Sequence, residues 1–74
     1  MGLKARLNLD KLLAEKGMSQ RELARITGIR QPSINDMCNG KYDRHVPLKN
    51  IALICEALNE PVEKLIVLER VEDN

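Results

Sequence analysis

Three glycines divide the first 40 residues of this sequence into short segments, and their spacing limits the length of any helix formed there. Gly17 and Gly28 are 11 residues apart, and Gly40 follows 12 residues later. Glycine is common just after the last residue of a helix, because the backbone there often takes a positive φ that other residues avoid. The spacing therefore predicts three short helices that end close to these glycines.

The composition favours helices throughout the chain. Its 74 residues are rich in Leu, Ile, Val and Ala, with a single Tyr and no Phe or Trp. A chain of this length buries only about 60% of the surface that it exposes when unfolded, so its core must be small. Leu and Ala favour helices, and short helices bury their apolar faces by packing together. We therefore expect one domain over residues 1–74 with a compact, all-α fold.

Candidate caps mark where the first two helices begin. Asn8 is placed to cap a helix over residues 9–16. Ser19 and Glu22 have the spacing of a capping box, which predicts that a second helix begins there and ends near Thr27. The expected buried face of this second helix consists of Leu23, Ala24 and Ile26.

Prolines mark the start of the three helices that follow. Pro32 falls in the first turn of a helix over residues 31–39, where a missing amide proton does no harm. Pro47 opens a fourth helix, and Pro61 opens a short fifth one. The side chains expected to face the core are Ile34 and Met37 in the third helix, Leu48, Ile51, Ala52, Ile54, Cys55 and Leu58 in the fourth, and Val62 and Leu65 in the fifth.

Both ends of the sequence carry strand-like segments. Leu3, Ala5 and Leu7 alternate with polar residues, a period of two that predicts a short strand. Residues 66–71 (IVLERV) are rich in β-branched side chains. They would pair with the N-terminal segment in a short β-ribbon, extend the last helix, or contact a second subunit, and the ribbon is the favoured interpretation.

The net charge of +1 conceals an uneven distribution along the chain. Residues 1–49 hold ten Lys or Arg and five Asp or Glu, which gives +5, whereas residues 50–74 hold two and six, which gives −4. A basic first part and an acidic second part suit a binding face for a polyanion on one side of the molecule. In so short a chain, chance also produces such an asymmetry.

Several classes of protein are not expected from this sequence. It has no run of about 18 apolar residues to span a membrane, and its N-terminal residues are too polar for a signal peptide. We therefore expect a cytoplasmic protein. An enzyme is not expected, because there is no glycine-rich phosphate loop and no nucleophile with a plausible histidine partner.

Cysteine and histidine are too few for a metal site. Cys38 and Cys55 are the only cysteines, and His45 is the only histidine. Cys38 and His45 together would supply two ligands, whereas a structural zinc site has four. We expect two free thiols packed as small apolar groups, with no metal and no cofactor.

Residues 19–40 combine two short helices with a tight turn at Gly28. Ala24 lies where these helices would approach most closely, so a larger side chain there would push them apart. The polar side of the second helix would then face outward, and such a helix fits the major groove of DNA, which is about 12 Å wide. The apolar residues that would hold it across the first helix are Leu23, Ile29, Ile34 and Met37.

In these features the sequence resembles the Cro- and lambda-repressor-like family of helix-turn-helix DNA-binding domains. The resemblance covers about residues 8–66, including the segment PLKNIALICEALNEPVEKL for the fourth and fifth helices. It implies a five-helix fold and sequence-specific binding of double-stranded DNA by a transcriptional regulator, with repression as the expected effect. The matching motif positions are Gln20, Leu23, Ala24, Gly28, Ile29, Ile34, Met37 and Gly40.

The resemblance also implies which side chains contact DNA, with residues 31–39 as the recognition helix. Pro32 departs from the family pattern, which has a polar or small residue there, and Asp36 would be repelled by phosphate unless it accepted from a cytosine amine. The implied base-reading side chains are Gln31, Pro32, Ser33, Asn35 and Asp36. The implied phosphate contacts are Gln20, Arg21, Arg30, Asn39, Lys41 and Arg44.

One recognition helix covers only a few base pairs, so DNA binding by this chain implies a homodimer. We expect the fifth helix and residues 66–71 to supply the interface. The alternative is a protein-interaction module of the same fold, such as an antitoxin or anti-repressor, since an apolar C-terminal segment also suits a protein partner. No small-molecule ligand is expected, and RNA is disfavoured by the shortage of aromatic residues on which bases could stack.

Overall fold

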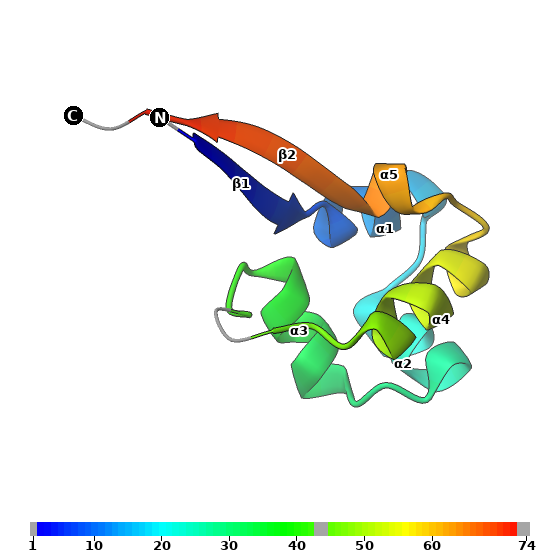
Figure 1. Cartoon of the computed structure of the whole chain (residues 1–74). Coiled ribbons are helices and arrows are strands. Elements are labelled where there is room, and N and C mark those ends of the chain that lie inside the picture. Colours follow the sequence, from blue (N-terminus) through cyan, green and yellow to red (C-terminus); the bar gives the residue numbers. More distant parts are fainter. Residues whose placement is uncertain (1, 43–44, 73–74) are drawn as a thin grey trace.

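The computed structural model describes residues 2–42 and 45–72, which form five helices and two strands (Figure 1). The fold is mostly helical, as expected, although the antiparallel sheet means that all-α is only roughly correct. In chain order the elements are β1 (Gly2–Leu7), α1 (Leu9–Lys16), α2 (Gln20–Thr27), α3 (Gln31–Cys38), α4 (Leu48–Leu58), α5 (Val62–Leu65) and β2 (Ile66–Val71).

The ends of the first three helices agree with the glycine spacing. Gly17, Gly28 and Gly40 have φ angles of 65°, 78° and 75°, which is the left-handed region that glycine enters at little cost. Beyond α3, the amide of Lys41 donates to the carbonyl of Asp36 at 2.8 Å, so the chain closes the helix by turning back over its last turn. Each helix is therefore stopped locally by its own sequence.

The starts of α1 and α2 have different causes. Ser19 Oγ accepts a hydrogen bond from the amide of Glu22 at 3.0 Å, so the expected cap of α2 is present. Asn8 lies at the expected start of α1, but its side chain does not cap that helix. Instead, its backbone amide donates to the carbonyl of Leu65 at 2.7 Å, and its side-chain amide donates to the carbonyl of Lys64 at 3.5 Å. Asn8 therefore ties the start of α1 to α5.

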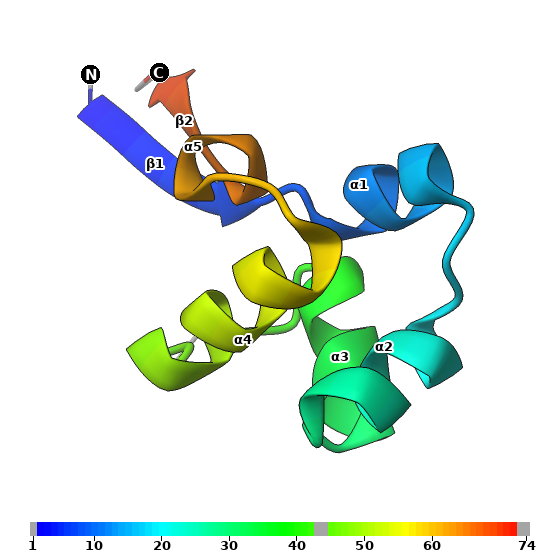
Figure 2. The same cartoon turned by 90° about the vertical axis from the view of Figure 1, so that its right-hand side faces the viewer.

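One core, drawn from all five helices and the turn between α2 and α3, holds the fold together. α2 packs against α3 and α4, while α1 packs against α3 and α5 (Figure 2). These contacts remove a continuous set of aliphatic side chains from water, which is the main source of stability in so small a protein. The buried side chains are Leu9, Leu12, Leu13, Leu23, Ile29, Ile34, Met37, Ile51, Ile54, Leu58 and Leu65.

Some apolar side chains expected in the core are exposed. Leu48 is 83% exposed and Ile26 is 48% exposed, and Ala52 and Val62 also face solvent. In α4 the buried stripe is centred near Ile54, and the helical period of about 3.6 residues turns Leu48 and Ala52 beyond its edge. In the same way, Leu23 defines the buried side of α2, and Ile26 falls outside it.

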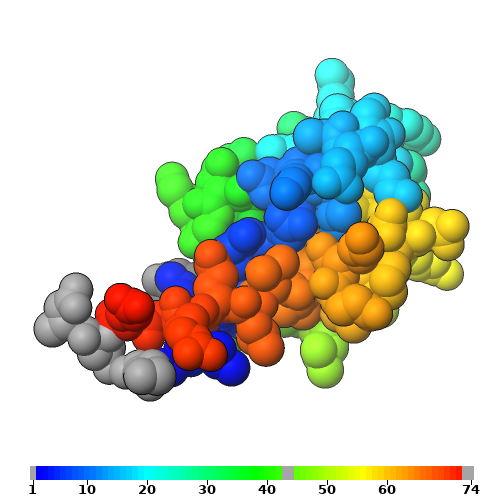
Figure 3. Space-filling model, turned by 90° about the horizontal axis from the view of Figure 1, so that it is seen from above, coloured from blue at the N-terminus to red at the C-terminus, as the bar shows by residue number. Residues whose placement is uncertain are grey.

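The strands β1 and β2 form an antiparallel ribbon that projects from the helices (Figures 1 and 2). Gly2 lies opposite Val71 at the tip of the ribbon, and Leu7 lies opposite Ile66 where it joins the helices. The molecule is 42 Å long and about 20 Å across in the other directions. Viewed from above, β2 and α5 form part of the outer surface (Figure 3). The ribbon interpretation of residues 66–71 is therefore confirmed.

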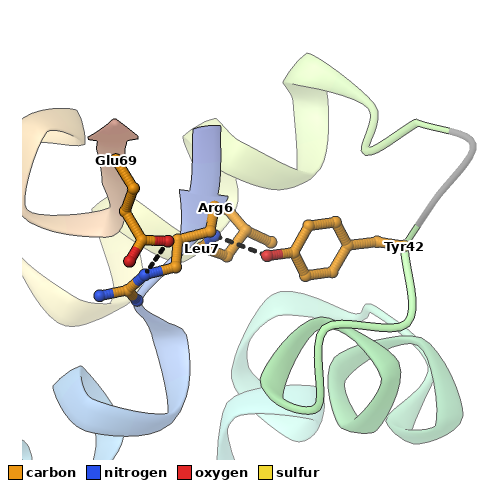
Figure 4. Close-up of polar contacts among 4 residues, drawn as sticks. All are labelled: Arg6, Leu7, Tyr42 and Glu69. Atoms are coloured by element: carbon orange, nitrogen blue, oxygen red, sulfur yellow. Dashed lines mark hydrogen bonds and ion pairs between the residues drawn. The ribbon is translucent and has the colours of Figure 1, made fainter. Parts of the chain in front are cut away.

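Two polar contacts fix the ribbon in place (Figure 4). The backbone amide of Leu7 donates to the hydroxyl of Tyr42 at 2.8 Å, which connects β1 to the loop after α3. Arg6 Nε lies 2.9 Å from Glu69 Oε1, joining the two strands through an exposed ion pair. Tyr42 thus packs partly buried against the core and binds a residue 35 positions earlier.

A further ion pair joins the end of α1 to the segment before α5. Lys16 Nζ lies 2.7 Å from Glu60 Oε2. This hydrogen bond lowers the pKa of the Glu60 carboxyl below its ordinary value, because it stabilises the charged form.

None of the helices in residues 2–42 and 45–72 is long and apolar enough to cross a membrane.

Candidate nucleic-acid interface

The turn between α2 and α3 is held by backbone and side-chain hydrogen bonds. Thr27 Oγ1 donates to the carbonyl of Leu23 at 2.7 Å and accepts from the amide of Ile29 at 3.2 Å. The amide of Gly28 donates to the carbonyl of Ala24 at 2.9 Å. Because these bonds satisfy the polar groups at the end of α2, the chain reverses tightly and places α3 across it.

Burial divides α3 into two sides. Ile34 is fully buried and Met37 nearly so, and both belong to the common core. These two anchors fix how the helix is rotated, so its remaining side chains are directed to solvent. The exposed side chains are Gln31, Pro32, Ser33, Asn35 and Asp36, which are the five expected to read bases. The structure thus brings these five residues together on one exposed helix face, and their contact with bases stays a prediction.

The start of α2 lies beside the start of α3. Gln20, Gln31, Pro32 and Asn35 line one shallow hollow between these helices. The hydroxyl oxygen of Ser19 accepts a hydrogen bond from the amide of Glu22. The other amides in the first turn of α2 have no carbonyl partner within the helix, and they lie at the positive end of the helix dipole. A phosphate beside Gln20 would meet these amides, which suits the phosphate contact expected at this position.

Asn35 and Asn39 are linked to each other on the surface of α3. Asn39 Nδ2 donates to Asn35 Oδ1 at 3.0 Å. The bond occupies the carbonyl oxygen of Asn35 and leaves its two amide hydrogens free to donate. This hydrogen bond therefore fixes the two side chains relative to each other. Asn35 is expected to read a base, and Asn39 is expected to contact a phosphate.

Several cations around α3 have no carboxylate partner among the residues that the structure describes. Arg21, Arg30 and Lys41 are exposed, and within the described part of the chain none of them forms an ion pair. Arg25, by contrast, lies 3.9 Å from Glu22 on the same helix. Cations without an anionic partner are the ones best placed to attract phosphate. Arg44, also expected to contact phosphate, lies outside the described residues.

Sequence reasoning missed two residues of this surface, Lys49 and Asn50. Both line a hollow together with Arg30 and Ser33. They belong to the first turn of α4, which the packing of α4 against α2 brings to this side of the molecule. The only sequence signal was a lysine in the turn after Pro47.

A further hollow lies between α3 and the loop that follows it. It is lined by Ser33, Asp36, Lys41, Tyr42 and His45, among others. Ser33 therefore lies between two hollows that each contain a cation, Lys41 on one side and Lys49 on the other. Asp36 adds a negative charge to an otherwise polar or basic surface.

Cys38 lies on the less exposed side of α3. Burial raises the pKa of its thiol, and the negative charge of Asp10 raises it further. A thiol of this kind stays protonated at neutral pH and is a poor nucleophile. Among the residues that the structure describes, no three His, Cys, Asp or Glu side chains are grouped as they would be around a metal ion.

Comparison with known proteins places this surface in context. The sequence profile of the Cro/C1-type HTH DNA-binding domain matches residues 8–70. A crystal structure of a candidate DNA-binding protein from Bacteroides fragilis is similar to this chain, with a TM-score of 0.76 and 25% sequence identity, covering 86% of this chain and 100% of that one. The transcriptional regulator VanUg is also similar, with a TM-score of 0.71, 27% identity and coverage of 93% and 89%. No curated protein matches.

Proposed function

The chain belongs to the Cro/C1-type helix-turn-helix DNA-binding domain family, and we propose that it is a transcriptional regulator that binds a specific double-stranded sequence. In this proposal α3 enters the major groove and presents its exposed side to the bases. Bound at a promoter, the domain would act as a repressor, because occupying the site is sufficient to exclude other proteins.

The observation that carries this proposal is the division of α3 into an anchored side and a polar side. Ile34 and Met37 are buried, so the helix cannot rotate its polar side chains away from a ligand. Gln31 and Ser33 lie near its N-terminus, the part of a recognition helix that reaches base edges. Gln31 can pair with adenine through two hydrogen bonds, and Ser33 can contact a base or a phosphate.

Flanking residues would hold the DNA backbone. Gln20 lies on one side of α3, and Arg30 and Lys41 lie at its two ends. Asn39 and Arg21 are further candidates, and Lys49 joins them because it shares a hollow with Arg30. Such contacts fix orientation on the duplex, whereas the base contacts carry the specificity.

A single domain of this size reads too few base pairs to select one site in a genome. We therefore propose that two copies bind an inverted repeat, with half-sites about 10 base pairs apart or a multiple of that distance.

The alternative function is that of an antitoxin-like or anti-repressor module. It is favoured by one observation, the exposed Leu3 and Leu68 on the ribbon, which would also suit a different protein partner.

Selection from a randomised duplex pool tests the proposed function directly. We expect the protein to enrich an inverted repeat at near-physiological salt. Replacing Gln31→Ala or Ser33→Ala should relax particular positions in that repeat. Each lost base contact should reduce discrimination by about 1–3 kcal/mol, which is roughly 5- to 150-fold.

The control is Glu15→Ala, which changes an exposed residue of α1 that lines none of the hollows around α3. This variant should select the same repeat as the wild type. If the wild type enriches no sequence and binds only weakly and non-specifically, specific DNA binding is refuted. The antitoxin-like function would then be supported.

A further inference from the structure

Two asparagines on the exposed side of α3 are joined by a hydrogen bond with a defined direction. Asn39 Nδ2 donates to Asn35 Oδ1 at 3.0 Å. The two residues are four positions apart, so they are neighbours on the helix surface, where bonds between polar side chains stabilise a helix. Both side chains are exposed, and Asn35 lies on the side of α3 that we propose to face the bases. The orientation of its amide therefore decides which atoms a base would meet.

The position of Asn39 explains why it is the donor. Its backbone amide donates to the carbonyls of Asn35 at 3.1 Å and Asp36 at 3.3 Å, so the residue is held at the end of the helix. The C-terminal end of a helix carries a partial negative charge, because its last carbonyls have no helical partner. A side-chain amide at this end is most stable with its NH2 group turned toward the helix and its oxygen turned away. Asn39 therefore donates, and Asn35 accepts.

The bond also fixes which atoms of Asn35 are available to a ligand. The oxygen and the nitrogen of an amide lie on different sides of the same carbon. Since Oδ1 of Asn35 is turned toward Asn39, its Nδ2 is turned away. This nitrogen carries two hydrogens, and within the described residues neither is donated to another group. Asn35 also lines the hollow that it shares with Gln20 and Gln31, where it therefore presents hydrogen-bond donors.

A side chain that presents donors distinguishes guanine from the other bases in the major groove. Guanine offers two acceptors, O6 and N7, whereas adenine has an amine in place of O6. Thymine offers one acceptor, and cytosine offers a donor. An asparagine that pairs with adenine needs its oxygen for the adenine amine. Asn35, in the orientation observed, would instead bring its own NH2 group against that amine, while the same group can donate to both acceptors of guanine.

We propose that Asn39 is a positioning residue: it holds the side-chain oxygen of Asn35 away from the base, so that Asn35 selects guanine. This inference deepens the proposed function and rests on it, because the contact requires α3 in the major groove. Asn39 itself touches no base. The second hydrogen of its Nδ2 stays free, so Asn39 can also contact a phosphate.

Reversing the amide of Asn35 tests this inference. Asn39→Asp replaces the donor by a carboxylate, which only accepts hydrogen bonds. The carboxylate would accept from Nδ2 of Asn35 and so turn Oδ1 of Asn35 toward the base. We therefore expect the base enriched at the position that Asn35 contacts to change from guanine to adenine. Asn39 is exposed and has a φ of −102°, which any residue adopts, so the variant should fold.

Two further variants identify that position and separate orientation from contact. All are selected from the same randomised duplex pool as the wild type. Asn35→Ala removes the contact, so the position that it reads is the one at which this variant loses the preference for guanine. A single base contact corresponds to a loss of about 5- to 150-fold. Asn39→Ala keeps the contact but lets the amide of Asn35 turn over, and it should enrich guanine and adenine about equally there.

The matched control is Asn59→Asp. Asn59 ends α4 as Asn39 ends α3, and it is exposed and lines none of the hollows around α3. The same substitution there adds a negative charge to a helix end without contacting Asn35, so guanine should stay enriched. The quantity compared is the enriched base and not the affinity. Weaker binding caused by a charge near phosphate therefore does not imitate the expected change from guanine to adenine.

The possible outcomes distinguish this inference from the proposed function. If the wild type enriches a repeat but Asn39→Asp keeps guanine at the position lost in Asn35→Ala, the inference is wrong and specific DNA binding stands. The inference is also wrong if the wild type prefers adenine at that position, or if Asn35→Ala alters no position. If the wild type enriches no sequence, the proposed function is refuted and the inference with it.

Discussion

Tyr42 shows how one side chain can connect parts of a small fold that are distant in sequence. It is the only aromatic residue of the chain, and its hydroxyl accepts a hydrogen bond from Leu7, 35 residues earlier. The partner of its hydroxyl was not predictable, because nothing in the sequence near residue 7 distinguishes that amide from its neighbours. Through this contact Tyr42 also closes part of the outer edge of β1.

Replacing Tyr42→Phe should therefore lower the free energy of unfolding by about 0.5–1.5 kcal/mol, the usual net value of one hydrogen bond. The reason is that the amide of Leu7 loses its partner while the ring is kept. Urea unfolding followed by circular dichroism measures the change. For comparison, Arg6→Met removes the exposed ion pair with Glu69 and should cost about 0–1 kcal/mol. An unchanged urea midpoint for Tyr42→Phe would show that the hydrogen bond adds nothing to stability.

At the scale of elements, helix ends were predictable because their causes are local. Gly17, Gly28 and Gly40 end α1, α2 and α3 with positive φ, and each acts within one helical turn. The face that each helix buries was less predictable, since it depends on which neighbours pack against it. Ile26 and Leu48 are apolar residues at helical spacing, yet they are exposed because the core contacts of α2 and α4 lie to one side of them.

The residues of the candidate site likewise differ in whether the sequence predicts them. The exposed side of α3 was predictable, because Ile34 and Met37 mark its buried side and the polar residues follow from the helical period. The positions of Lys49 and Asn50 were not predictable, because these residues reach this surface only through the packing of α4 against α2. A sequence pattern therefore identifies the proposed recognition helix more readily than the residues that surround it.

The cap of α2 offers a test at this scale. Ser19→Ala removes the oxygen that accepts from the amide of Glu22 and should cost about 0.5–2 kcal/mol of stability. Ser19→Asp keeps an acceptor and adds a negative charge at the positive end of the helix, so it should unfold at nearly the same urea concentration as the wild type. Equal destabilisation by both substitutions would contradict the capping role.

At the scale of the whole molecule, charge is arranged by element. Exposed cations without ion pairs in the described residues occur around α3, among them Arg21, Arg30 and Lys41. The acidic excess belongs to residues 50–74, which supply the rest of α4, α5 and β2. A small net charge therefore coexists with a basic surface around α3, as a molecule that presents one side to a polyanion requires.

The salt dependence of DNA binding should reveal whether the basic surface around α3 contacts phosphates. The logarithm of the affinity falls with the logarithm of salt concentration by about 0.9 for each phosphate contacted. We expect Arg30→Gln, Lys41→Gln and Lys49→Gln each to reduce this slope by about 0.9. Arg25→Gln removes a cation that lies near Glu22 and should leave the slope unchanged. Fluorescence anisotropy with labelled duplex over a salt series gives the slopes, and an equal effect of all four substitutions would argue against a localised DNA face.

The pairing of β1 with β2 has a consequence for the order in which the protein is made. Gly2 and Val71 are partners in the ribbon, although nearly the whole sequence separates them. Protein synthesis adds about 5–20 residues per second, so the nascent chain carries an unpaired β1 for several seconds, whereas α3 contacts both α1 and α2, which are close to it in sequence. The ribbon is therefore completed last. Any assembly that uses the ribbon therefore forms only after residues 66–71 have left the ribosome. A chain whose synthesis stops earlier would contain the helices but would have no β2 to pair with β1.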